Sequence, residues 1–119
     1  MDTVNFITIE KGDDLFLSFS FNEGTRFGVE GFIIQRMPKF EFVLSSDERG
    51  PSVDWTAEDE RILIKKMNVT PREVLIETTR DKYIFDLSKI SGAEYSEIVS
   101  ILKKMNFDNV FDLKIQHQS

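Results

Sequence analysis

The chain has 119 residues, of which 40% are hydrophobic and 30% charged, as expected for one globular domain rather than a disordered chain. It contains no cysteine, which excludes disulfides, thiolate nucleophiles and cysteine-based metal sites. Its net charge of −6 at pH 7 disfavours nucleic acids and anionic membranes as partners and favours a basic protein or peptide.

We expect a single domain over residues 1–119, because the chain shows no internal repeat, low-complexity segment or linker. The first residues, Met1–Phe6, lack the basic and apolar regions of a signal peptide. No apolar run approaches the ~20 residues that a membrane-spanning helix needs. A cytoplasmic location follows as an expectation.

The first half of the chain predicts strands. We expect a first strand at residues 4–10, and a turn at 11–14 leads to a second at residues 15–21. There Leu15, Leu17, Phe19 and Phe21 alternate, with Ser18 and Ser20 on the opposite face. Residues 22–31 carry three of the six glycines and predict a loop. Two further strands are expected at 32–36 and 40–44, with Pro38 between them.

A dense turn at residues 45–52 precedes a short strand expected around 53–55 and a longer one at 61–66. Residues 73–78 and 83–87 predict a hairpin, because a short polar connection separates two apolar runs. We expect the strands to pair in a mainly antiparallel manner.

One helix is expected at about 91–105. Ser91 and Glu94 fit a capping box, and Tyr95, Ile98, Val99, Leu102 and Met105 form one apolar stripe. Residues 107–115 are apolar enough to form a last strand. The predicted fold class is therefore α+β: a twisted, mainly antiparallel sheet with one C-terminal amphipathic helix packed on one face.

Catalytic patterns are absent from the sequence. The single histidine, His117, stands near the C-terminus, so the usual Ser–His and Cys–His triads and zinc hydrolase sites are not expected. The glycine-rich stretch 24–31 lacks the Gly-Lys-Ser/Thr ending of a phosphate-binding loop. We expect no enzyme activity, cofactor or metal. A hydrolase built on two carboxylates is the open alternative, since acids are plentiful.

The acids are unevenly distributed. Residues 1–60 hold thirteen Asp/Glu against five Lys/Arg, whereas residues 61–119 hold eight against ten. Six of the thirteen lie between residues 47 and 60, around the only tryptophan. The predicted partner interface consists of Asp47, Glu48, Asp54, Trp55, Glu58, Asp59 and Glu60. Tryptophan is frequent among interface hot spots, and acids steer a basic partner. Alternatively, Trp55 belongs to the core and the acids only keep the protein soluble.

Three stretches of the chain resemble a family of bacterial polymorphic-toxin immunity proteins, immunity protein family ten. They are GFIIQR at 31–36, FEFVL at 40–44 and DERGPS at 47–52, within a resemblance that covers about residues 30–107. Gln35 and Arg36 match the strand ending of that family. The resemblance implies a small cytoplasmic protein, expected to be monomeric, that binds one toxin domain and blocks it. Such proteins are commonly acidic because many of their toxins are basic nucleases.

A second class of function stays open beside the immunity protein. A non-catalytic structural or chaperone-like module would also lack catalytic residues, and it would be expected to form a homodimer through a large apolar patch.

Overall fold

The computed structural model describes residues 2–21, 31–43, 49–53 and 62–116. Within these ranges the elements follow in the order β1 (Asp2–Thr3), β2 (Phe6–Lys11), β3 (Leu15–Ser20), β4 (Gly31–Arg36), η1 (Pro38–Val43), β5 (Ser52–Val53), β6 (Ile62–Val69), β7 (Glu73–Thr78), β8 (Lys82–Asp86), α1 (Gly92–Met105) and β9 (Asp112–Ile115). This arrangement confirms the predicted α+β class.

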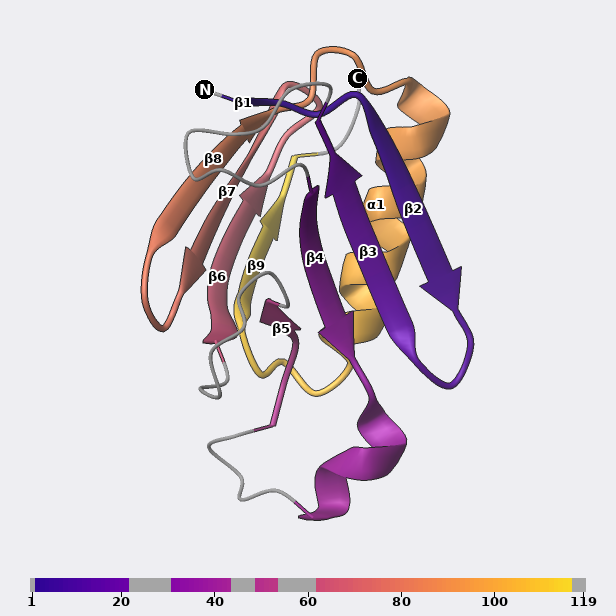
Figure 1. The fold of residues 1–119 in the computed structure, drawn as a ribbon, viewed down its shortest axis with the longest axis vertical. Helices are drawn as coiled ribbons and strands as arrows, with labels where there is room; N and C mark the ends of the chain where they lie inside the picture. Colours follow the sequence, from indigo (N-terminus) through magenta and orange to yellow (C-terminus); the bar gives the residue numbers. More distant parts are fainter. Residues whose placement is uncertain (1, 22–30, 44–48, 54–61, 117–119) are drawn as a thin grey trace.

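The strands form one sheet in the order β1-β8-β7-β6-β5-β4-β3-β2, with β9 pairing with β6. All neighbours are antiparallel except β1 with β8 and β9 with β6. Only Val4 and Asn5 separate β1 from β2, although these strands stand at opposite ends of the order. The amide of Val4 donates to Asp86 and that of Asn5 donates to Ser20. The sheet therefore curls until its two ends approach each other at the N-terminal segment (Figure 1).

Aromatic rings from the two halves of the curled sheet meet in the core. Phe32 of β4 lies 5.0 Å from Phe85 of β8, measured between ring centroids, and Phe19 of β3 lies 6.1 Å from the same ring. The alternation predicted for β3 is confirmed, because Leu17 and Phe19 are fully buried. On β4 the buried positions are Phe32, Ile34 and Arg36. An arginine thus occupies an inward position of a core strand.

Helix α1 covers the sheet next to β2 and β3 (Figure 1). The predicted capping box is present at its start: Glu94 donates its amide to the Ser91 hydroxyl, and Ser91 donates its amide to the Glu94 carboxylate. Its buried stripe consists of Tyr95, Ile98, Ile101, Leu102 and Met105. The stripe differs from the predicted one at a single position, because Ile101 is fully buried and Val99 only partly so. No helix in the ranges above is long and apolar enough to cross a membrane.

The strand expected at 40–44 is wrong. Residues Pro38–Val43 form the 3-10 helix η1, which extends beyond the end of β4 (Figure 1). Pro38 begins it, since a fixed φ and a missing N–H suit the first helical position. The second reason is the ion pair of Glu41 with Arg36, five residues earlier. Glu41 is turned inward to the same side as Arg36, whereas in an extended chain this odd spacing would place the two side chains on opposite faces.

Candidate functional site: an arginine-centred cluster beside the acidic segments

All seven residues predicted to form the partner interface lie outside the described residues. They belong to two stretches of sequence, 44–48 and 54–61, which we call the acidic segments. The structure does describe the piece of chain between them, Arg49–Val53, and the strand residue Ile62 that follows. The structure therefore describes the site through Arg49–Val53 and Ile62, where the acidic segments join the rest of the chain.

The piece Arg49–Val53 is firmly attached to the sheet. Residues 50–53 are all buried. The carbonyl of Pro51 accepts a 2.9 Å hydrogen bond from the amide of Ile64. Val53 is the register partner of Ile34 on one side and of Ile62 on the other. The two ends of segment 54–61 are consequently joined to neighbouring strands at one directly paired position.

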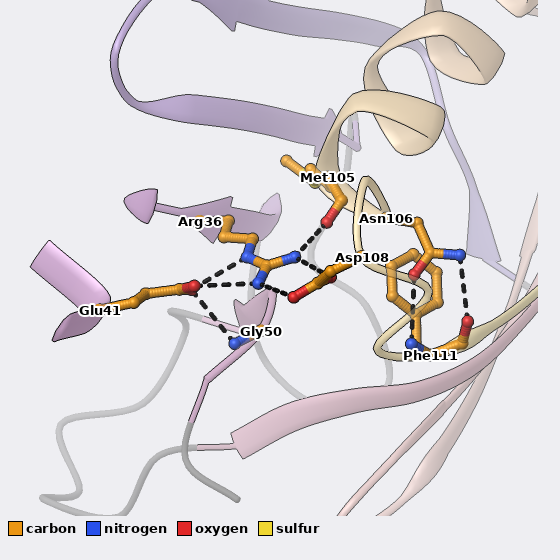
Figure 2. Close-up of polar contacts among 7 residues, drawn as sticks. All are labelled: Arg36, Glu41, Gly50, Met105, Asn106, Asp108 and Phe111. Carbon is orange, nitrogen blue, oxygen red and sulfur yellow. Dashed lines mark hydrogen bonds and ion pairs between the residues drawn. The ribbon is translucent and has the colours of Figure 1, made fainter. Parts of the chain in front are cut away.

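Gly50 takes a backbone conformation in this piece that other residues rarely adopt. Its φ is +134°, in a region that side chains rarely adopt, and an added Cβ would lie 3.4 Å from a methyl of Val110. The amide of Gly50 donates to a carboxylate oxygen of Glu41 at 3.2 Å (Figure 2). Glu41 and Gly50 are thus tied together across the chain that contains segment 44–48.

Arg36 is the centre of the cluster in Figure 2 and uses all five of its N–H donors. It binds Glu41 in a bidentate manner, with two bonds of 2.9 Å, and Asp108 in the same manner, also at 2.9 Å. Its remaining donor bonds the carbonyl of Met105 at 2.6 Å. The ring of Phe107 lies over the guanidinium, 4.3 Å from its central carbon. Such pairing is what allows a charged side chain to be 98% buried, as the 2% exposure of Arg36 shows.

Charge–charge contact keeps all three groups ionised. Hydrogen bonds from Arg36 lower the pKa of Asp108 below its usual range. Burial alone would raise the pKa of Glu41, but the hydrogen bonds from Arg36 and from Gly50 outweigh it and lower the pKa. Burial alone would likewise lower the pKa of Arg36, but its two carboxylate partners raise it. Neither carboxylate of this cluster is therefore suited to hold a proton for general acid catalysis near pH 7.

The turn after α1 completes the cluster. The side-chain amide of Asn106 donates to the carbonyl of Phe111 at 3.0 Å and accepts from the amide of the same residue at 3.1 Å (Figure 2). Asn109 takes a positive φ of 54°, which asparagine tolerates well. Phe111 is buried, whereas Phe107 is 60% exposed and Val110 is 37% exposed. The turn is closed by its own side chains and presents two apolar groups outward.

A depression of about 220 Å³ lies at the end of β6 and β9, and its lining contains no carboxylate; it consists of Asn68, Val69, Thr70, Lys114, Ile115 and Gln116. Within residues 2–21, 31–43, 49–53 and 62–116, no group of three or more acidic, histidine or cysteine side chains is arranged to hold a metal ion. The ion pairs of Arg36 with Glu41 and Asp108 form a structural cluster, which links β4, η1 and the turn after α1.

The sequence analysis did not predict the ion-pair cluster of Arg36, although the sequence contains one signal of it. Arg36 stands two residues after Ile34 and four after Phe32, so the alternation of β4 places it on the inward face. A buried arginine requires a carboxylate partner. The partner Asp108 stands 72 residues further along the chain, so no local pattern could identify it.

No family model, curated protein or solved structure matches the chain.

Proposed function

We propose that this protein is a cytoplasmic immunity protein, which binds a basic, nuclease-type toxin domain through the acidic segments and occludes the active site of that toxin. The resemblance of about residues 30–107 to immunity proteins supports this class of partner. The distribution of charge over the chain supports the choice of surface.

A single observation carries the proposal: six of the 21 acids lie between residues 47 and 60, around the only tryptophan. This stretch contains one base, Arg49, so its formal charge of −5 is most of the net −6 of the chain. Acidity that served solubility alone would not need to concentrate in one stretch of sequence.

The attachment of these segments favours a binding role. Residues 50–53 lie between them in sequence and are buried, and Pro51 accepts a hydrogen bond from Ile64, so both segments begin or end beside a fixed part of the sheet. Fixed attachment points limit the conformational entropy that a segment loses on association. A concentrated negative field also accelerates the encounter with a basic protein.

The first test is rescue of growth. We expect this chain to protect cells that express the C-terminal toxin domain of a large exoprotein encoded next to its gene. Protection should accompany a complex of the two purified proteins. Cells that die despite full expression of the chain would contradict the proposal.

The second test separates the acidic segments from acidity in general. Reversal of three acids in E58K/D59K/E60K should slow association with the toxin domain by about tenfold or more at low salt. The matched control D14K/E73K/E97K changes the net charge equally at three exposed positions of the body. Association rates measured against salt concentration should fall steeply for the wild type. Equal effects of the two triple variants, or salt-insensitive association, would sink the electrostatic mechanism.

A further inference from the structure

The turn Asn106–Phe111 exposes two apolar side chains beside the attachment piece Arg49–Val53. Phe107 is 60% exposed and Val110 is 37% exposed. Other exposed large apolar residues of the described body, such as Phe6 on β2 and Ile84 on β8, stand singly on their strands. Two exposed apolar groups on one short turn form a small apolar surface, which we call the Phe107–Val110 knob.

The knob is held rigidly. Asn106 closes the turn by two hydrogen bonds to Phe111, whose ring is anchored in the core. Asp108 is fixed by two bonds from the buried Arg36, and the ring of Phe107 rests on the same guanidinium. A ring that is already fixed in position loses little conformational freedom when a partner covers it, which is a property of interface anchors.

The knob also lies next to the described piece of chain between the acidic segments. A Cβ added to Gly50, the second residue of that piece, would lie 3.4 Å from a methyl of Val110. Glu41, which receives the amide of Gly50, shares Arg36 with Asp108 of the knob. One network of bonds therefore connects Gly50, in the piece between the acidic segments, to the turn that carries Phe107.

We infer that the Phe107–Val110 knob is the apolar centre of the toxin-binding surface. This inference rests on the proposed function. The partner it fits is a basic protein domain with an apolar depression beside its Lys/Arg residues. The acids would set the rate of association, and the knob would set the lifetime of the complex, because desolvated aromatic anchors act chiefly on dissociation.

The test measures dissociation from an inactivated toxin domain encoded by the neighbouring gene. We expect F107A to dissociate about 30-fold faster or more, with an association rate close to that of the wild type. The matched control is F6A, the same change at a ring that is 56% exposed on β2, and it should stay within about threefold of the wild type. F107L, which keeps an apolar group but loses the ring, should fall between the two.

The outcomes separate this inference from the proposed function. If F107A and F6A both bind like the wild type while E58K/D59K/E60K binds slowly, the knob is not part of the interface and the immunity function stands. If the wild type does not bind the toxin domain, the function fails and the inference fails with it. Should thermal melting show that F107A is unfolded, V110S replaces it, because Val110 makes no bond to Arg36; unchanged dissociation of folded V110S would then overturn the inference.

Discussion

The two ends of helix α1 are closed in opposite ways. At the N-terminus, Ser91 and Glu94 exchange two hydrogen bonds within four consecutive residues, at the exposed surface. At the C-terminus, the Met105 carbonyl, one of those that a helix leaves without an internal partner, is bonded by a buried arginine from β4. The first closure is local and the second depends on residues 5, 69 and 72 positions away from Arg36. The second closure also supports the proposed binding surface.

The largest expected effect in this comparison comes from removal of Arg36. R36M should destabilise the protein by about 3–5 kcal/mol, because Glu41 would remain buried without its cationic partner. The free energy of unfolding in urea measures this loss. The matched control R72M removes an exposed arginine from the link between β6 and β7 and should change stability by less than about 0.5 kcal/mol. A loss of less than about 1 kcal/mol in the free energy of unfolding of R36M would show that the cluster does not stabilise the fold.

A smaller effect distinguishes the two carboxylates of the cluster. The side chain of Glu41 is 10% exposed, whereas that of Asp108 is 41% exposed. Water screens the second pair more, so E41Q should cost about 2–3 kcal/mol and D108N about 1 kcal/mol or less. Urea unfolding of both variants at pH 7 gives the comparison. Equal losses would mean that exposure does not decide the worth of these ion pairs.

The same contrast explains which parts of the molecule the sequence could predict. The capping box and the stripe of α1, like the alternation of Leu15, Leu17 and Phe19, are periodic patterns within a few residues, and the structure confirms them. A strand is expected at 40–44 because its apolar residues resemble one, but the ion pair of Glu41 with Arg36 favours the 3-10 helix Pro38–Val43. The parallel pairing of β9 with β6 joins residues far apart in sequence, so no local pattern predicts it.

The candidate site likewise has one part that the sequence predicts and one part that it does not. Its acidic part was predicted from the density of Asp and Glu around Trp55, and this stays a prediction, since those residues lie outside the described ones. Its supporting part was not predicted, because Gly50, Val110 and Phe107 are ordinary turn and tail residues until the fold brings them to Arg36. Sequence periodicity identifies surfaces made by one element, whereas this surface is assembled from β4, η1, Arg49–Val53 and the turn after α1.

Acid should weaken the C-terminal closure selectively. Because the pKa values of Glu41 and Asp108 are lowered in the folded state, the unfolded chain takes up protons first as the pH falls. Their contribution is fully present above the ordinary carboxyl pKa values of about 4 and is lost as the pH falls through the lowered ones. Thermal melting between pH 7 and pH 2 should show this loss, and R36M should show less of it. An R36M curve parallel to that of the wild type would assign the acid sensitivity to other carboxyl groups.

The smallest expected effect belongs to the local closure. S91A removes the hydroxyl that accepts the Glu94 amide and should cost about 1 kcal/mol, because water can replace part of an exposed cap. S96A, in the first half of the helix and exposed, is the matched control and should leave stability unchanged or slightly raised, since alanine favours helices. Urea unfolding measures both. If S91A lost as much free energy of unfolding as R36M, burial would not explain a difference in stability between the two ends of α1. The buried Arg36 cluster would then not be what holds Arg49–Val53 and the turn after α1 in place.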